Sequence, residues 1–393
     1  QLFRQVQSPR HVVSELLQNA DDAGAREAGV SIGDGEFVFW HNGEDFTREQ
    51  FGSICRFAYS NKRTLHTIGF RGIGFKSTFS LGDEVRLLTP TLAVMFRRSR
   101  FTEPIWISGT PHPTRTEVRV KFRDEFQKVE LEKNLHDWLQ SPASLLFFHS
   151  VRKLQIESTG IHWRTVAAGP VPNSHYLAID DQTASKVLLL RSAEESLPQE
   201  AVNEILEERG IIGDGTSEMP PARVEVVLGI ESLLYVVLPT GVRTSLPFAC
   251  NAPFIQDPAR FLIKEPANSP TNRWLLQRIG QLAGATMVTW LQREDLSLHE
   301  RAKAYELLSD VNRNDASIQG SVATIVELAI EEQLIESDYF LTESGTVVDS
   351  ENCVDVPHEL HDVWTSQQIS SLFDESGRQL LCRRLIRKAE RSC

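Results

Sequence analysis

The first clear pattern of hydrophobic and polar positions is an amphipathic segment near the start of the chain. Apolar residues recur at helical spacing from Val12 to Ala20, after Ser8 and Pro9 and before Gly24. Serine caps helix N-termini, proline fits a first helical turn, and glycine commonly follows the last turn. The pattern therefore predicts a helix between residues 8 and 24 that covers an apolar core with one face.

Alternating patterns next to this helix predict a sheet. Residues 30–32 and 37–40 flank the turn formers Gly33-Asp34-Gly35, which is typical of a β-hairpin. Thr47 with Gln50 three residues later predicts a capped short helix that runs to about residue 57. Further strands are predicted at 84–88, 92–96 and 117–121. Helices would then pack on a largely antiparallel sheet.

From about residue 145 the pattern indicates a second α/β region and then a helical one. Strands are predicted at 145–148, 154–156, 186–190, 224–228 and 233–238, with a helix near 200–209. Helical spacing dominates 272–290, 298–308 and 321–334, before a mixed tail that ends in basic residues. We therefore expect three units, at 1–158, 159–297 and 298–393, the last a mostly helical extension.

Composition restricts the class of protein without indicating its chemistry. The 393 residues are 41% hydrophobic and 24% charged, which is ordinary for a folded chain of two or three domains. A net charge of -12 disfavours a surface built wholly for nucleic acid. Five scattered cysteines without a C-x-x-C pair favour a reducing, cytoplasmic location. No apolar run reaches the roughly 20 residues that span a bilayer, so no membrane partner is expected.

The polar stripe of the first predicted helix carries candidate chemistry. Glu15, Asn19 and Asp22 are spaced i, i+4 and i+7, so two carboxylates and an amide share one helix face. Taken alone, this spacing also fits the solvated face of any amphipathic helix. A glycine-rich segment further along the chain favours the functional interpretation.

That segment, residues 69–79, reads Gly-Phe-Arg-Gly-Ile-Gly-Phe-Lys-Ser-Thr-Phe. Its glycines leave backbone N–H groups exposed ahead of a predicted helix N-terminus, which suits an anion such as phosphate. It is not a P-loop, because Phe75 separates Gly74 from Lys76. The glycine order, G-x-x-G-x-G, also differs from that of the dinucleotide fingerprint.

Four motifs, in this order, resemble the ATP-binding domain of the GHKL superfamily, which is shared by gyrase, heat-shock chaperones of the HtpG type, histidine kinases and MutL. They are E-x-x-x-N-A-x-D-A at 15–23, H-N-G at 41–43, G-x-x-G-x-G at 69–74 and T-E-V-R-V at 116–120. Within the superfamily, the segments 15–25 and 69–79 are most similar to sacsin and its bacterial relatives. The resemblance is specific to about residue 125 and weaker to about residue 295.

The resemblance implies an α+β protein: a Bergerat-type two-layer α/β sandwich, then a transducer-like α/β domain and the helical C-terminal region. It also implies ATP and Mg²⁺ as ligands. Glu15 would orient and deprotonate the attacking water, Asn19 would be the Mg²⁺ ligand, and Asp22 would lie beneath the nucleotide. Intact Glu15 favours hydrolysis over binding alone.

Other positions would complete the nucleotide site. The phosphate-binding segment would include Gly69, Gly72, Ile73 and Gly74. Lys76 or Lys62 would add positive charge, a solvated lysine being the alternative for each. Thr116 matches a pocket threonine of the superfamily, and an ordinary strand threonine is the alternative.

One motif departs from the family pattern. The family's D-x-G-x-G segment begins with an aspartate that accepts the adenine amino proton, whereas this chain has His41-Asn42-Gly43-Glu44-Asp45. Asn42 or a neutral His41 is a substitute acceptor. A nucleotide with another base is the alternative.

The superfamily also implies a cation from a second domain that reaches the γ-phosphate. Arg260 and Lys264 are candidates, and a loop packed on its own domain is the alternative. We therefore expect an ATPase whose lid, formed by about residues 47–68, closes on the nucleotide. Its second domain would then dock, and it would act on a protein partner or client and form a nucleotide-dependent homodimer.

The alternative function is a nucleotide-binding module with little turnover that docks a protein or nucleic acid. It would dock through an arginine-rich face or through the basic tail. The face would contain the arginines at 97, 98, 100, 115, 119 and 123. Because acidic residues alternate with them, an exposed sheet face is the other interpretation of these arginines.

Overall fold

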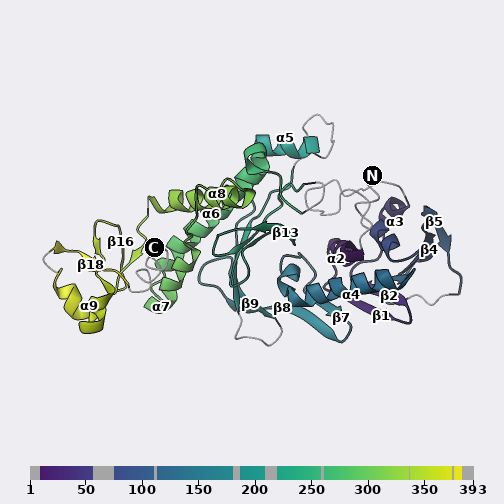
Figure 1. The fold of residues 1–393 in the computed structure, drawn as a ribbon, viewed down its shortest axis with the longest axis horizontal. Helices are drawn as coiled ribbons and strands as arrows, with labels where there is room; N and C mark the ends of the chain where they lie inside the picture. The colour runs from purple at the N-terminus through teal and green to yellow at the C-terminus, as the bar shows by residue number, and fades with distance from the viewer. Residues whose placement is uncertain are drawn as a thin grey trace.

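The computed structural model describes residues 9–55, 75–109, 113–179, 186–208, 219–257, 261–335, 337–373 and 376–382. It confirms an α+β architecture with a large sheet and several helices. The molecule is elongated, with the first helices at one end and a small C-terminal unit at the other (Figure 1). Among the described helices, none has the length and apolar character to cross a membrane.

The first half of the sheet is built mainly from antiparallel strands, as predicted. These strands are β1 Glu27–Gly33, β2 Glu36–His41, β3 Glu84–Leu88, β4 Ala93–Arg97, β5 Arg100–Trp106, β6 Thr116–Lys121 and β7 Lys153–Ile156. Their spatial order is β7-β1-β2-β6-β3-β4-β5, with β1 and β7 parallel. The predicted hairpin joins β1 to β2 through Asp34 and Gly35, whose positive φ angles of 52° and 74° fit its two-residue turn.

Helices cover one face of this half. They are η1 Pro9–His11, α2 Val12–Asp22, α3 Arg48–Ile54, η2 Phe75–Ser80, α4 Glu125–Gln140 and η3 Pro142–Leu145. Apolar residues of α2 and α4 enter the same core as the strands. The predicted capping box of Thr47 and Gln50 is present at α3. The predicted cap Ser8 lies outside the described residues, and Gly24 follows α2 with a φ of 69°.

The predicted strand at 145–148 is wrong. Leu145 ends the 3-10 helix η3, and the chain then turns. All four residues, Leu145 to Phe148, are buried. A short apolar run can indicate burial without indicating an extended backbone, and here it did so.

The second half continues the same sheet. Its strands are β8 Thr159–Ala168, β9 Ser174–Ile179, β10 Val187–Arg191, β11 Glu225–Leu228, β12 Leu233–Val236, β13 Leu238–Arg243 and β14 Ala249–Asn251. The long β8 pairs with β7 through residues 159–162 and with β9 through residues 163–168. One 14-stranded sheet results. The single strand predicted at 233–238 is two strands, because Val237 has a φ of 62° between β12 and β13.

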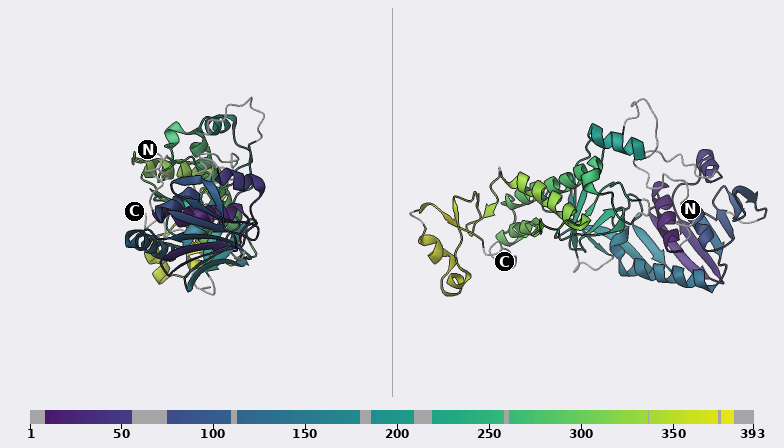
Figure 2. Two further views of the ribbon diagram at one scale, coloured as in Figure 1. Left: turned by 90° about the vertical axis from the view of Figure 1, so that its right-hand side faces the viewer. Right: turned by 45° about the horizontal axis from the view of Figure 1, so that its top comes forward.

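Long helices pack on this second half, near the predicted positions. They are α5 Gln199–Glu208, η4 Pro266–Asn268, α6 Pro270–Leu291, α7 Leu298–Arg301, η5 Ala302–Leu307 and α8 Ile318–Ile335. The green helices α6 and α8 lie side by side (Figures 1 and 2). A Cβ atom on Gly280 of α6 would lie 2.4 Å from the carbonyl oxygen of Val326, so glycine permits this close approach.

The mixed tail forms a small unit beyond α8. It contains β15 Phe340–Leu341, β16 Val347–Val348, β17 Cys353–Val354, α9 His358–Val363, α10 Ser366–Ser371 and β18 Gln379–Leu380. Val356, Ile369 and Leu380 form a separate small core there. Figure 1 shows this yellow unit at the end of the molecule opposite to α2.

Candidate functional site

The helix α2 carries the three predicted polar residues. Glu15 and Asn19 are half-buried and Asp22 is exposed, whereas Val12, Val13, Leu16 and Leu17 are buried beneath the helix. The helix packs against η2 and β2. Its polar stripe therefore faces away from the apolar core, and Asp22 lies at the end of the helix that meets the H-N-G segment.

The H-N-G segment is held against the end of α2 by backbone contacts. Asn42 Oδ1 accepts hydrogen bonds from the backbone N–H groups of Arg26 and Glu27, each at 3.0 Å. The N–H of Glu44 donates to the carbonyl oxygen of Ala23 at 2.8 Å. The first two sequence motifs are thus brought together. The side-chain amide oxygen of Asn42 stabilises the backbone of residues 26 and 27 at the start of β1.

His41 and Thr116 face each other on neighbouring strands. They are register partners of β2 and β6, and they share the covered face with Phe39 and Val118. His41 is 5% exposed, and its Nδ1 accepts a hydrogen bond from the N–H of Gly43 at 3.1 Å. Burial lowers the pKa of His41 to about 4, with Asp45 opposing the shift. The imidazole is therefore neutral at pH 7.

Thr116 carries a buried polar atom that makes no hydrogen bond within the described part of the chain. The side chain is 2% exposed, and its Oγ1 has no hydrogen-bond partner among the described residues. A buried hydroxyl without a partner costs folding free energy, so such atoms in native structures call for an explanation. A polar group of a ligand beside Thr116 would supply this partner, so the position is compatible with the edge of a nucleotide base.

Asp45 anchors the far end of the same segment. Its Oδ2 accepts from the N–H and the hydroxyl of Thr91 at 3.0 and 2.7 Å, and its Oδ1 accepts from the N–H of Phe46 at 2.7 Å. Burial raises the pKa of Asp45, but the hydrogen bonds from Thr89 and Thr91 outweigh this effect and leave the pKa below its ordinary value. Residues 41–45 are therefore fixed at both ends.

The 3-10 helix η2 begins where the glycine-rich segment ends. Lys76 is 7% exposed, and its Nζ lies 4.9 Å from the centroid of the Phe101 ring. Burial lowers the pKa of Lys76, with Cys55 opposing the shift. Gly69, Gly72, Ile73, Gly74 and Lys62 lie outside the described residues.

Asp21 is a structural residue that the sequence interpretation missed. It is 5% exposed, and its carboxylate accepts from the backbone N–H groups of His149, Ser150 and Val151 at 3.0, 2.6 and 2.9 Å. These contacts fasten the end of α2 to the segment that leads into β7. Because the partners are 128 to 130 residues away, no local signal separates Asp21 from Asp22.

Lys264 lies in the second half and already has partners. Its Nζ is 3.0 Å from Glu204 Oε1 and 2.7 Å from Glu208 Oε1, both on α5. The hydrogen bonds from Lys264 to Glu208 and Glu204 raise its pKa. A γ-phosphate would compete with these carboxylates for the Lys264 ammonium group, and the role of Lys264 stays a prediction. Arg260 lies outside the described residues.

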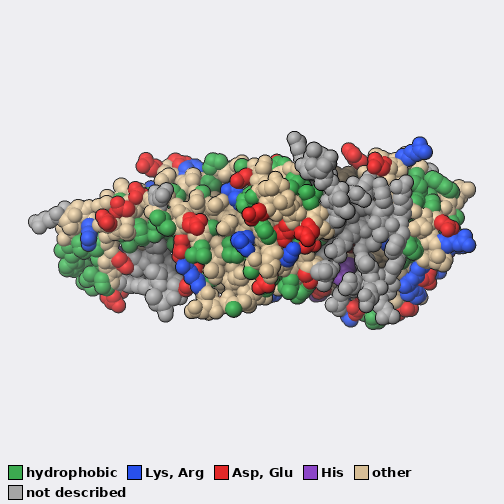
Figure 3. Space-filling model, turned by 90° about the horizontal axis from the view of Figure 1, so that it is seen from above, with side chains coloured by type: hydrophobic (Ala, Val, Ile, Leu, Met, Phe, Trp, Pro, Cys, Tyr) green, Lys and Arg blue, Asp and Glu red, His purple; other side chains and the backbone are tan. Residues whose placement is uncertain are grey.

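The six arginines of the predicted docking face all form ion pairs with acidic side chains. The ion pairs are Arg97–Glu84, Arg98–Asp83, Arg100–Glu103, Arg115–Glu117, Arg119–Glu117 and Arg123–Asp83. Figure 3 shows Lys and Arg intermixed with Asp and Glu at this end of the molecule. Each of the six arginines thus has an acidic neighbour, which reduces the local positive charge that a nucleic acid would meet.

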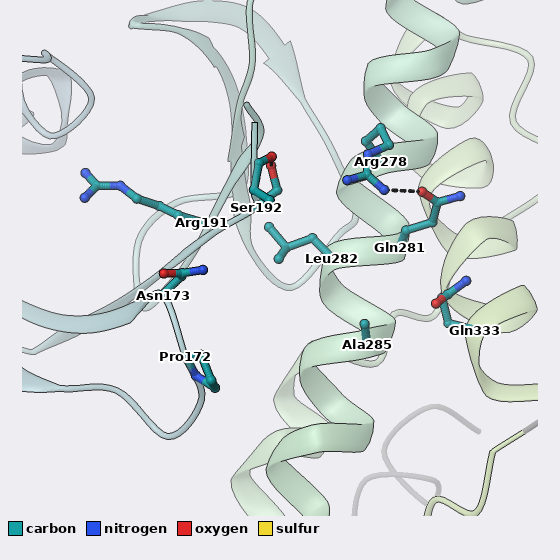
Figure 4. Close-up of a pocket in the computed structure, with 10 residues that line it drawn as sticks. Pro172, Asn173, Arg191, Ser192, Arg278, Gln281, Leu282, Ala285 and Gln333 are labelled. Carbon is teal, nitrogen blue, oxygen red and sulfur yellow. Dashed lines mark hydrogen bonds between the residues drawn. The ribbon is translucent and has the colours of Figure 1, made fainter. Parts of the chain in front are cut away.

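A separate open pocket lies in the second half, between the sheet and the pair α6 and α8 (Figure 4). Its lining includes Asn173, Arg191, Arg278 and Gln281. Arg278 donates to Gln281 Oε1 at 2.9 Å, and Arg191 turns away from α6 and pairs with Glu225. Both arginines of this pocket thus already have hydrogen-bond or ion-pair partners within the protein. Within the described part of the chain, no three His, Cys, Asp or Glu side chains gather as ligands for a metal ion.

Comparisons with known proteins support the GHKL superfamily, which the sequence motifs resemble. No protein-family model matches the chain. The chain is 38% identical over 106 residues to the DNA mismatch repair protein MutL of Chlorobium chlorochromatii (strain CaD3), which covers 23% of the chain and 16% of that protein. It is 32% identical over 177 residues to the MutL of Chlorobium limicola, which covers 40% of the chain and 27% of that protein.

The chain thus spans little more than a quarter of the length of these relatives at most. MutL is one of the proteins that define the GHKL superfamily. The matches support this superfamily for the chain and, at that level, an ATPase-type nucleotide module.

Proposed function

We propose that this chain is an ATP-dependent conformational switch, which binds ATP with Mg²⁺ between α2 and the strands β2 and β6 and hydrolyses it. One observation carries the proposal: the unpartnered hydroxyl of Thr116 lies opposite His41, and the helix that carries Glu15 and Asn19 packs against the strand of His41, β2. The partial similarity to MutL supports the same class of site.

Binding would divide between the base and the phosphates. Thr116 and His41 would meet the base, and Asp22 would lie near it at the end of α2. The amides of Gly69, Gly72, Ile73 and Gly74 would hold phosphate oxygens, with charge from Lys76. Asn19 would offer its amide oxygen to Mg²⁺, and the bound ion would offset the negative charge of the phosphates.

Hydrolysis would depend on Glu15. Its carboxylate, one helical turn before Asn19, would orient a water molecule and accept its proton as the water attacks the γ-phosphate. Because the general base Glu15 and the Mg²⁺ ligand Asn19 belong to one rigid helix, the spacing of these two side chains would be fixed before the nucleotide binds.

The continuous sheet would transmit a change at the nucleotide site to the second half of the chain. Asp21 fastens α2 to the segment before β7, and β8 continues from β7 into the second half. A shift of α2 on nucleotide binding would therefore reach the second half directly. Arg260 or Lys264 would read the γ-phosphate. A protein client, a sacsin-like chaperone role and a nucleotide-dependent homodimer belong to the same proposal.

Calorimetric titration of ATP into the full chain tests the proposal. We expect Mg²⁺-dependent binding that is lost in Asn19→Ala, because the variant removes a metal ligand. Asn314→Ala is the matched control, since Asn314 is an exposed asparagine between η5 and α8, outside the proposed site. Failure of the wild-type chain to bind ATP with Mg²⁺ would contradict the proposal.

Single-turnover hydrolysis separates the switch from the alternative, a binding module with little turnover. The switch predicts that bound ATP is converted to ADP and that a non-hydrolysable ATP analogue compacts the chain or dimerises it in small-angle scattering. Tight binding without conversion would favour the binding module.

A further inference from the structure

The helix α8 has apolar side chains on the face that turns away from its partner α6. Its inner face is identified by contacts with α6, where Cβ atoms on two glycines would lie 2.4 Å from the carbonyl oxygen of Val326 and 2.7 Å from Cβ of Gln333. Leu328 and Ile335 each follow one of these residues by two positions, which is about 200° around a helix. They are 42% and 79% exposed.

Acidic side chains border this apolar face. Glu331 and Glu332 lie between Leu328 and Ile335 in the helix, and both are exposed. Arg313 forms an ion pair with Glu331, whereas Glu332 has no ion pair among the described residues. We call residues 328, 331, 332 and 335 the outer face of α8. A second copy of α8 would bring carboxylates against carboxylates, whereas an apolar stripe bordered by cations would complement the outer face.

The sequence contains a segment of this kind after the last described residue. Residues 383–393 read Arg-Arg-Leu-Ile-Arg-Lys-Ala-Glu-Arg-Ser-Cys. Leu385, Ile386 and Ala389 are spaced i, i+1 and i+4, so they would share one face of a helix. Arginine or lysine occupies five of the other positions, against one glutamate. The spacing therefore predicts a basic amphipathic helix.

The segment starts close to the end of α8. Cys382, its neighbour in the chain, donates its N–H to the carbonyl oxygen of Leu341 at 2.9 Å. The hydroxyl of Tyr305 accepts from the N–H of Leu341 at 2.7 Å and donates to the carbonyl oxygen of Tyr339 at 2.6 Å. Burial is the main cause of the raised pKa of Tyr339, and the charge of Glu331 adds to it. These contacts connect Cys382 with the acidic border of the outer face.

The length of the segment is sufficient to cover the outer face. A helix rises about 1.5 Å per residue, so residues 383–393 would span about 16 Å, whereas Leu328 and Ile335 are separated by about 10 Å along α8. A helix that ran back antiparallel to α8 would therefore reach both. Docking within one chain also has a high effective concentration, so a small contact area is sufficient.

We propose that residues 383–393 dock as an amphipathic helix on the outer face of α8. The apolar stripe of the segment covers Leu328 and Ile335, and its cations lie beside Glu331 and Glu332. The outer face of α8 is thus an interaction surface for a segment of the same chain. This inference does not depend on nucleotide binding.

Limited digestion of the full chain with trypsin tests the proposal. Trypsin cleaves after arginine and lysine, and release of the tail beyond residue 383 can be followed by mass spectrometry. A docked helix is cleaved only when it opens, so the cleavage rate reports the population of the open form. The variant Leu328→Ser with Ile335→Ser removes the apolar contact, and we expect it to release the tail about tenfold faster than wild type.

A matched variant keeps the test specific. Val363→Ser with Leu372→Ser removes two exposed apolar side chains from the small C-terminal unit and should leave the rate at the wild-type value. Equal rates in wild type and in Leu328→Ser with Ile335→Ser would overturn the proposal. Protection of the wild-type tail that disappears on dilution would also overturn it, because the outer face would then bind a second copy of the chain.

Discussion

A Cβ atom on Gly43 would lie 2.7 Å from the carbonyl oxygen of Ala23, closer than real Cβ atoms approach such a group. The two segments are also joined by the hydrogen bond from Glu44 N–H to the same oxygen. Packing between the H-N-G segment and the end of α2 therefore requires glycine at this position. The same contact places the Gly43 N–H against His41 Nδ1.

Replacing Gly43 should accordingly destabilise the fold. Gly43→Ala forces the segment away from α2, and we expect a loss of about 1–3 kcal/mol in the free energy of unfolding, measured with urea. Gly52→Ala is the matched control, because nothing lies within 4 Å of its Cβ position in α3. Alanine there should be neutral or stabilising by up to about 1 kcal/mol. Similar unfolding midpoints for both variants would contradict the contact.

The neighbouring residues Asp21 and Asp22 should have different roles, Asp21 in the stability of the fold and Asp22 in nucleotide binding. Asp21→Ala leaves three backbone N–H groups without their acceptor and should cost about 3 kcal/mol or more. Asp22→Ala should change stability by less than about 1 kcal/mol, because the side chain is exposed, but it should weaken nucleotide binding. Chemical denaturation and calorimetry on both variants check this. Equal destabilisation by the two would contradict the assignment.

His41 should make stability depend on pH below neutrality. Its pKa falls from 6.5 in the unfolded chain to about 4 in the fold, so between these values the unfolded state binds more protons. Stability is therefore full above pH 6.5 and is lost progressively as the pH falls toward 4. Integration gives a loss of about 2 kcal/mol between pH 7.5 and pH 5.

Urea unfolding of wild type and His41→Gln at both pH values isolates this contribution. Glutamine does not titrate, so the variant should lack the extra loss of about 2 kcal/mol, even if its stability is lower throughout. An equal pH response in the two proteins would show that His41 is not held neutral by burial.

Lys264 distinguishes a catalytic cation from a structural one. If it reads the γ-phosphate, Lys264→Ala should reduce ATP turnover by about 10²-fold or more while ATP affinity persists. Glu208→Ala removes one of its partners and should not reduce turnover. If Lys264 only joins the segment before α6 to α5, both variants should lower stability slightly and leave turnover unchanged. Arg260→Ala tests the second candidate by the same assay.

Local signals account for the parts of the fold that could be predicted. The hairpin at Asp34-Gly35 and the capping box of Thr47 depend on residues within a few positions of one another, and both are present. The break at Val237 and the turn after Leu145 depend on tertiary packing, which overrides local patterns.

In the candidate site, too, some features follow from the local sequence and others depend on the folded structure. The spacing of Glu15, Asn19 and Asp22 on one helix followed from helical periodicity alone. The bonds that occupy Asn42, the anchoring of Asp21 and the hydrogen bond to His41 Nδ1 all depend on backbone groups in the fold. Residue types alone could not indicate them, because an amide or an imidazole can donate or accept.

The central claim is that Glu15 acts as the base for hydrolysis of a bound nucleoside triphosphate, and turnover of Glu15→Ala against wild type tests it most directly. ATP binding with Mg²⁺, measured by calorimetry, should be retained, while the steady-state rate of ATP hydrolysis should fall by about 10²-fold or more. Glu15→Gln should behave in the same way, because it keeps the shape of the side chain and removes the base. Unchanged turnover in Glu15→Ala, with binding intact, would contradict the account.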